Sequence, residues 1–176
     1  MNFLAILFLI FFNFLNAQDQ FTIPSPETIN KYWYQQGAEI SSFALTQQRY
    51  GETRNGYMVN IFVTEPFDSK KQVKADHPAE NINSIKILKL NQVKKFNTGI
   101  YQYSLLTSSF TPFENKGASP MKVTCSIQEW CGHAFYQFNQ KGTDYSVKGF
   151  SYFESEGDIE KEIKNVYLED GVWNQI

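Results

Sequence analysis

The chain has 176 residues, with 16 Lys and Arg against 18 Asp and Glu, which gives a formal net charge of -2 at pH 7. Nucleic acids and anionic membrane surfaces select for a clear excess of positive charge, so neither is expected as a partner. The length fits one domain, and no internal repeat or low-complexity segment divides the chain.

The amino terminus is expected to be a signal peptide. Residues 3–12 form an unbroken apolar run, which is shorter than the roughly 20 residues of a spanning helix but typical of a signal peptide. Ala17 is a small residue at which cleavage can occur. We therefore predict a signal peptide over 1–17 and a single β-rich domain over 18–176, exported to the periplasm or cell envelope and not membrane-spanning. No Lys or Arg precedes the run, so an uncleaved anchor is the alternative.

The first element expected after the signal peptide is a short helix. Ser25 can cap its amino terminus, Pro26 suits the first helical position, and Gly37 suits the position just past the last turn. Its apolar side would comprise Ile29, Tyr32 and Trp33.

After this helix the apolar residues alternate, which predicts strands. The expected strands span 42–46, 57–64, 85–90, 100–112, 121–138 and 145–153. An Asn-Gly pair at 55–56 predicts a hairpin loop, and Pro66 is expected to end the second strand because proline cannot donate to a ladder. Short connections favour pairing between consecutive strands.

Three further segments complete the predicted fold. The polar stretch 67–83 predicts a solvated loop that exposes His77, and a switch of parity within 85–90 predicts a bulge. Apolar residues over 159–167 are spaced as on a helix. We therefore predict a mainly β fold, an antiparallel meander of about six strands forming a curved sheet or partial barrel. One short N-terminal helix precedes it, and a C-terminal helix is a possible addition.

The segment 126–133 holds the densest group of chemically capable side chains. Treated as one strand, it places Glu129, Cys131 and His133 on one face, because alternate side chains point the same way. A nearby imidazolium stabilises a nucleophilic thiolate, so Cys131 could be a nucleophile with His133 as base and Glu129 orienting it. The competing interpretation, which we favour, makes Cys131 a small buried hydrophobic residue.

The two cysteines are expected to stay unpaired. In a strand, Cys125 and Cys131 would lie about 20 Å apart, whereas a disulfide needs roughly 4.4–6.8 Å between Cα atoms. The five residues between them include no Gly, Pro, Asn or Asp to reverse the chain. Gly132 is expected to mark a bend in the long strand.

Four runs of the sequence, 46–52 (TQQRYGE), 59–67 (VNIFVTEPF), 128–133 (QEWCGH) and 151–158 (SYFESEGD), carry a family resemblance. They are similar to an uncharacterised family of exported bacterial proteins that often carries the label "septum formation inhibitor Maf". The resemblance covers nearly all of the chain after the signal peptide. Family members are longer, which implies that this chain is the N-terminal part of a longer protein. They often begin with a lipoprotein cysteine, which this sequence lacks.

The Maf label itself does not describe these residues. Maf proteins are cytoplasmic nucleotide pyrophosphatases with an N-terminal Ser-x-x-Arg loop and an α/β fold, and this sequence shows neither feature. The resemblance therefore implies an exported protein and assigns no activity, cofactor or site residue to any position.

Two functions from different classes are compatible with the sequence. The favoured one is a non-catalytic binding or structural β module of the cell envelope, with a small apolar ligand or an envelope protein as partner. The alternative is a cysteine-dependent enzyme using Cys131, His133 and Glu129. No cofactor or metal is expected, since the chain has two histidines, few for a zinc site. The acids at 156 and 158 are more typical of a solvated turn than of a calcium site.

Cleavage of the signal peptide can be tested directly. Mass spectrometry of the protein recovered from its host should give Gln18 as the first residue, because the apolar run ends at a small residue suited to cleavage. Recovery of intact Met1 in the membrane fraction would contradict this prediction and support the uncleaved anchor.

Overall fold

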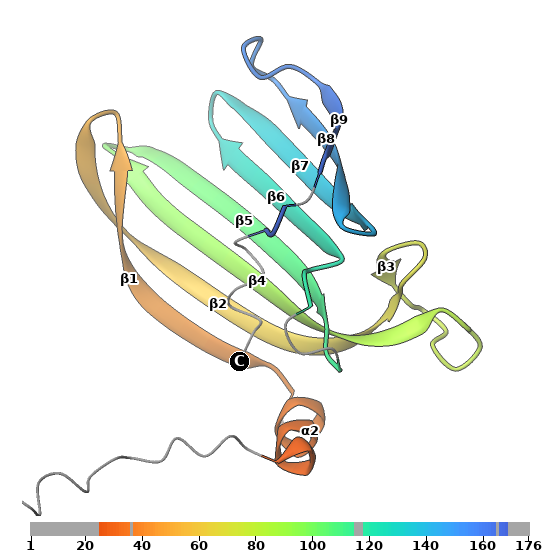
Figure 1. Ribbon diagram of the computed structural model, residues 1–176. Coiled ribbons are helices and arrows are strands. Elements are labelled where there is room, and N and C mark those ends of the chain that lie inside the picture. Colours follow the sequence, from red (N-terminus) through yellow and green to blue (C-terminus); the bar gives the residue numbers. More distant parts are fainter. Residues whose placement is uncertain (1–24, 36, 115–117, 165, 169–176) are drawn as a thin grey trace, which may run out of the picture.

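The computed structural model describes residues 25–35, 37–114, 118–164 and 166–168. This part of the chain forms one antiparallel sheet preceded by one helix (Figure 1). The predicted signal peptide lies outside the described residues. No helix in the described part is long and apolar enough to cross a membrane.

The sheet is a meander in which consecutive strands pair. Its strands are β1 (Glu39–Arg49), β2 (Glu52–Asp68), β3 (Val73–Lys74), β4 (Ser84–Thr98), β5 (Tyr101–Pro112), β6 (Lys122–Glu129), β7 (Gly132–Lys141), β8 (Asp144–Ser151) and β9 (Ile159–Ile163). They are arranged in the order β1-β2-β4-β5-β6-β7-β8-β9, with β3 paired to β2. The strands at the two ends of this order do not pair with each other, so the sheet is open.

The helix α2 (Pro26–Gln35) forms where the sequence predicts it. The Ser25 hydroxyl accepts a hydrogen bond from the Thr28 N–H at 3.2 Å, and Gly37 adopts a φ of 82°. These are the expected N-terminal cap and the expected left-handed residue after the helix. Trp33 is buried and joins α2 to the sheet. Its cluster comprises Phe62, Leu88 and Leu90, with Phe113 packed against them.

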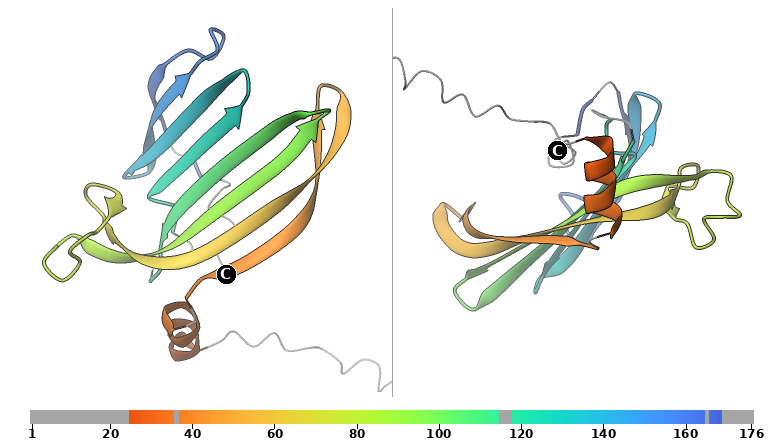
Figure 2. Two further views of the ribbon diagram at one scale, coloured as in Figure 1. Left: turned by 180° about the vertical axis from the view of Figure 1, so that it is seen from behind. Right: turned by 90° about the horizontal axis from the view of Figure 1, so that it is seen from below.

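The sheet curls towards one of its faces. Residues paired across adjacent strands share a face, so the register places Phe62, Phe96 and Tyr103 on the same side as α2. Tyr50, in the turn after β1, lies 2.8 Å from Tyr103 on β5, measured between the phenolic oxygens. Because β2 and β4 lie between those strands, this contact requires the curl seen in Figure 2. We call this side the concave face and the other the convex face.

Gly56 permits the close approach behind this curl. A Cβ at this position would lie 2.1 Å from the carbonyl oxygen of Lys95 and 2.8 Å from the Cβ of Phe96. Both strands are therefore too close for any residue with a side chain, which is one reason for glycine inside a strand.

The connection from β2 to β4 is a folded loop built around Asp68. The buried Asp68 carboxylate accepts hydrogen bonds from the backbone N–H groups of Lys70 and Lys71 at 2.9 and 2.8 Å. It also accepts one from the Asn81 amide at 2.8 Å. These donors, the Lys71 N–H foremost, hold the pKa of Asp68 below its ordinary value of 3.8. His77 is exposed in this loop, as predicted.

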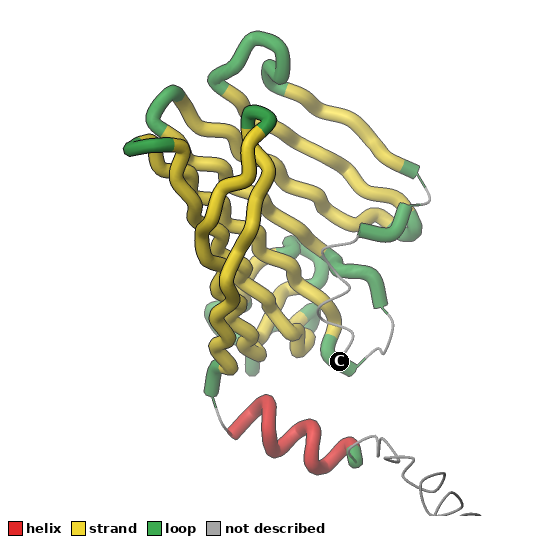
Figure 3. Tube along the Cα trace, turned by 90° about the vertical axis from the view of Figure 1, so that its left-hand side faces the viewer, coloured by secondary structure: helices red, strands yellow, loops and turns green. Residues whose placement is uncertain are grey.

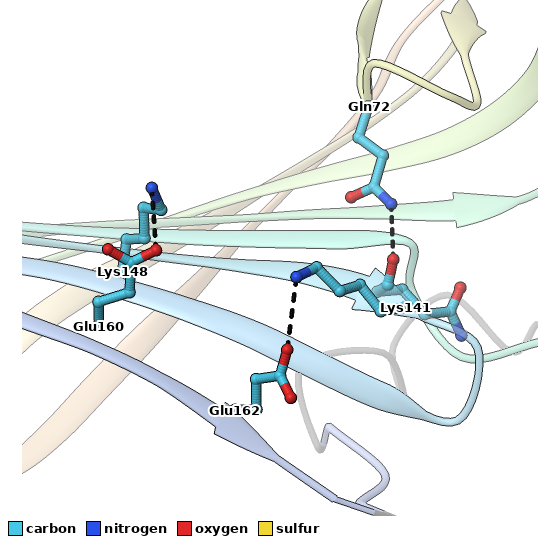
Figure 4. A network of polar contacts seen from close by, with 6 residues as sticks. Gln72, Lys141, Lys148, Glu160 and Glu162 are labelled. Carbon is cyan, nitrogen blue, oxygen red and sulfur yellow. Dashed lines mark hydrogen bonds and ion pairs between the residues drawn. The ribbon is translucent and has the colours of Figure 1, made fainter.

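Gln72 ties this loop to the far side of the sheet. Its amide donates to the Gln140 carbonyl at 2.9 Å (Figure 4), and its amide oxygen accepts from Asn139 at 2.7 Å. The Lys122 ammonium donates to the Gln72 carbonyl at 3.1 Å. The predicted solvated loop is therefore partly wrong, because its base packs against β6 and β7.

The antiparallel meander is confirmed, whereas the number of strands and the C-terminal element are not. Nine strands form in place of about six, because 121–138 is two strands, β3 was not predicted, and part of the possible helix over 159–167 is β9. The helical interpretation was based on the spacing of Ile159, Ile163, Val166 and Tyr167, of which the first two lie in β9. Residues four apart lie on one side of a strand as well as of a helix, and Ile159 and Ile163 both pair with β8.

Strand β2 extends beyond both predicted limits. The turn before it is Tyr50-Gly51, so the Asn-Gly pair at 55–56 lies inside the strand and not in a loop. Pro66 does not end β2. It pairs with Lys86 on one side, and its carbonyl accepts from the Ala75 N–H at 3.0 Å on the other. The lost donor is tolerated because neighbours on both sides hold the strand.

The predicted bulge within 85–90 is absent from the register between β2 and β4, which runs without interruption. Ile87 and Leu88 are instead both buried although they face opposite sides. A strand that is covered on both faces has an apolar run without alternation, and this produced the apparent switch of parity.

The role of Asp68 predicts an acid-dependent stability. Because the pKa of Asp68 is lowered in the folded protein, the carboxylate adds to the free energy of unfolding. This contribution is complete above the ordinary pKa of 3.8 and is lost as pH falls through the folded pKa. Asp68→Asn should lower the melting temperature at pH 7, and its difference from the wild type should shrink below pH 3.8. Thermal unfolding followed by circular dichroism would measure this.

The matched control is Asp76→Asn, which changes an exposed acid in the same loop. It should leave the melting temperature and its pH dependence nearly unchanged. Equal effects from both variants would show that the loop is not organised around Asp68.

Candidate functional site

The segment 126–133 is the end of a hairpin and not part of one long strand. β6 ends at Glu129, β7 begins at Gly132, and Trp130-Cys131 forms the turn between them. The predicted continuous strand over 121–138 is therefore wrong. The turn lacks the Asn or Asp that is typical of a two-residue hairpin turn. Gly132 is the first residue of β7 and does not bend a continuous strand.

This reversal separates the three residues predicted to act together. Glu129 pairs with Gly132, and His133 pairs with Gln128. Paired residues share a face, so Glu129 lies on the concave face and His133 on the convex face. The structure keeps Glu129 and Cys131 together but does not bring the His133 imidazole to the thiol.

The cysteines are unpaired, as predicted, but their environments differ from the expectation. Cys131 is exposed at the hairpin turn and Cys125 is half-buried within β6. The interpretation of Cys131 as a buried hydrophobic residue is therefore wrong. Its backbone N–H donates to the Tyr101 hydroxyl at 2.7 Å, which fixes the hairpin turn against β5.

Glu129 and Cys131 line a hollow of about 520 Å³ at this end of the concave face. Its walls come from four separate segments: the β1–β2 hairpin end, the β4–β5 hairpin end, the β6–β7 hairpin end and the segment after β8. Aromatic rings form much of the lining, namely Tyr50, Tyr101, Tyr103 and Phe153. Figure 1 shows the β1–β2, β4–β5 and β6–β7 turns at the upper end of the sheet.

The rings in and beside the hollow form a connected cluster. Tyr103 lies parallel to Phe96, with centroids 4.9 Å apart and an interplanar angle of 5°. Tyr101 lies 5.2 Å from Tyr103 and 5.1 Å from Trp130. Such contacts add to the burial of each ring, so the apolar surface is held in a fixed arrangement.

Arg49 provides the positive charge of the hollow. Its guanidinium lies 4.6 Å from the ring centre of Tyr50 and 5.1 Å from that of Tyr103, within the range of a cation–π contact. Hydrogen bonding to Tyr103 raises the pKa of Arg49 above its ordinary value. The group is therefore held as a cation between two phenols.

Tyr103 remains a hydrogen-bond donor at neutral pH. Burial and hydrogen bonding to Tyr50, together with the Glu129 carboxylate, outweigh the opposing effect of Arg49 and raise the pKa of Tyr103 to about 12. A phenol with this pKa is protonated throughout the physiological range, so it does not serve as a base.

Glu156 supplies a second carboxylate to the hollow, beside that of Glu129 in its lining. Its Oε2 accepts hydrogen bonds from the Ser151 hydroxyl at 2.7 Å and from the Tyr136 hydroxyl at 3.1 Å. These two donors, on β7 and β8, hold the Glu156 carboxylate in place. The lining of the hollow therefore includes two carboxylates and one guanidinium. Among the described residues, no three His, Cys, Asp or Glu side chains converge as a metal site would require.

Comparison with known proteins gave no match to a protein-family model, to a curated protein or to a solved structure. The resemblance to the exported bacterial family therefore stays a prediction.

Sequence reasoning identified two residues of this hollow, Glu129 and Cys131, and missed its tyrosines. Tyr50 directly precedes the turn glycine Gly51, and Tyr101 directly follows the Gly99-Ile100 turn. That recurrence of tyrosine near turns on the same end of a meander was the available signal. Alternation along β5 places Tyr101 beside Tyr103, whereas the approach of Tyr50 to Tyr103 depends on the curl, which no local pattern reports.

The placement of Cys131 predicts its reactivity. In the folded protein, iodoacetamide should label the exposed Cys131 before the half-buried Cys125, at the rate of an ordinary exposed thiol. His133→Ala should leave this rate unchanged, because His133 faces the other side of the sheet. Mass spectrometry of timed samples would follow both sites. Slower labelling of Cys131 in His133→Ala would contradict the hairpin geometry.

Proposed function

We propose that the protein is an exported, non-catalytic binding module of the cell envelope and that the hollow holds a small ligand. One observation carries this proposal. Four aromatic side chains, one guanidinium and two carboxylates from four separate segments converge on a single space. Small-molecule sites typically have volumes of about 300–1,000 Å³ and combine apolar walls with a few placed polar groups.

The walls define one part of the ligand. The rings of Tyr101 and Tyr103 are tilted by 43° to each other, and Tyr101 is the more exposed of the two. The Tyr101 ring therefore offers an apolar wall, which favours a ligand with a ring or another flat apolar face. Because these rings are positioned by contacts with Phe96 and Trp130, little rotamer freedom remains to be lost on binding.

The charges define the polar part. Glu129 and Glu156 accept hydrogen bonds, whereas Arg49 and the protonated Tyr103 donate them. Two carboxylates against one guanidinium leave a net charge of -1 in the hollow. This balance favours a neutral or singly cationic ligand with hydroxyl or amine donors, and it disfavours phosphates and nucleic acids. The predicted small apolar ligand is thereby refined to one with a polar edge.

A cysteine-dependent enzyme is the second candidate, and one contact favours it. Cys131 lies at the hollow, where its thiol could meet a bound molecule. The predicted base His133 faces the other side, so this candidate would need Glu129 as its base. Catalysis dependent on Cys131 would have to be seen before the proposal of a binding module is abandoned.

Fluorescence titration would test the binding site, because Trp130 is 64% exposed beside Tyr101. The probes are methyl glycosides as neutral ligands and phenethylamine as a cationic one. At least one probe should change the Trp130 emission. Tyr101→Ala should weaken its binding roughly tenfold, about 1.4 kcal/mol, and Glu129→Gln should weaken it through loss of an acceptor.

The matched controls are Tyr57→Ala and Glu160→Gln, which change an exposed ring and an exposed acid on the convex face. Both should bind the probe as the wild type does. Melting temperatures would show that Tyr101→Ala remains folded. Binding that survives Tyr101→Ala and Glu129→Gln together, or no binding of either probe class, would refute the proposed site.

A further inference from the structure

The two edge strands of the open sheet differ in how well they are protected against pairing with another chain. β9 is five residues long and carries Glu160, Lys161 and Glu162. Its acids pair with lysines of two other strands, Glu160 with Lys148 on β8 at 3.2 Å and Glu162 with Lys141 at the end of β7 at 3.5 Å (Figure 4). A short, charged edge strand discourages pairing with another chain.

The other edge strand, β1, is long, and its charged residues lie only at its two ends. It is eleven residues long, and the span 40–48 contains no charged residue, no proline and no glycine. Ile40 is 67% exposed and Phe43 is 42% exposed. No segment in the described part of the chain pairs with its outer side, which faces the viewer in Figure 3. Such an edge is a template for another strand.

The sequence of β1 is complementary to itself when reversed. If Ala44 faces Ala44 of a second copy, Glu39 lies opposite Arg49 at both ends of the ladder. Between these charges, small polar and apolar residues oppose residues of their own kind. These oppositions are Ser41 with Gln47, Ser42 with Thr46 and Phe43 with Leu45, and Ile40 with Gln48 is the exception.

We propose that two copies of the chain pair through β1, antiparallel and centred on Ala44, to form one continuous sheet. In this register every residue opposes one of the same parity, so the concave faces of both copies continue into each other. A shift by one residue would place concave against convex side chains. A shift by two would remove the opposition of Glu39 and Arg49.

The existing contacts of the two charged residues are compatible with this pairing. Glu39 accepts one hydrogen bond, from the Tyr32 hydroxyl at 2.7 Å. Arg49 lies over the rings of Tyr50 and Tyr103, hydrogen-bonds to Tyr103 and donates to the Tyr50 hydroxyl at 3.4 Å. A carboxylate has about four acceptor sites and a guanidinium five donors, so each keeps capacity for a partner. The paired backbones would add roughly ten hydrogen bonds.

Charge exchange at Ser42 and Thr46 tests both the pairing and its register. Both side chains are exposed and oppose each other only across the two copies. Sedimentation equilibrium of the whole protein should show a concentration-dependent dimer. The double variant S42K/T46K should weaken dimerisation at least tenfold, because it places like charges opposite each other. S42K/T46E should restore it, because the same positions then carry opposite charges.

Melting temperatures of both double variants would confirm that they fold. Amide hydrogen exchange gives a second readout, since β1 amides of the wild type should become more protected as protein concentration rises. A wild type that is monomeric at every concentration would overturn the proposal. Equal dimer dissociation constants for the two double variants would also overturn the proposal. That result would show that positions 42 and 46 of the two copies do not lie opposite each other.

Discussion

The end of the sheet that holds the hollow depends on one close approach between two strands. At Gly56 the backbone of β2 lies so near β4 that a Cβ would fall 2.1 Å from the Lys95 carbonyl oxygen. The strand pair can therefore curl, and the turn after β1 folds over the concave face until Tyr50 meets Tyr103. Without that curl, Arg49 and Tyr50 would lie two strands away from Tyr103, and the hollow would lose the wall that they form.

Local chemistry predicted the elements whose cause is local. The cap at Ser25 and the glycine at position 37 delimit α2 as expected, because they satisfy backbone groups within a few residues. The meander followed from alternation and short connections. The hairpin at Trp130-Cys131 was missed because neither residue is typical of a turn. The apolar residues at 134, 136 and 138 shift parity relative to β6, and this was the remaining signal of a reversal.

The candidate site could be predicted only where its members are close in sequence. Glu129 and Cys131 were found because they lie two residues apart, and their shared hollow survives the correction from strand to hairpin. His133 was wrongly included because a two-residue turn exchanges the faces of the residues that follow it. Tyr101 and Tyr103 share a face of β5 because they lie two residues apart. Tyr50 joins them only through the curl of the sheet, which depends on contacts between the β1–β2 turn and β5 and not on any periodicity.

The long-range polar ties of this fold have a kinetic consequence. A meander pairs each strand with its neighbour in the chain, so the sheet can form one hairpin after another. The Tyr50–Tyr103 contact joins residues 53 apart, and the Gln72–Asn139 contact joins residues 67 apart. Both can close only when the strands between them are in place. These ties therefore act mainly on the rate of unfolding, and they set how long the folded chain persists once it has formed.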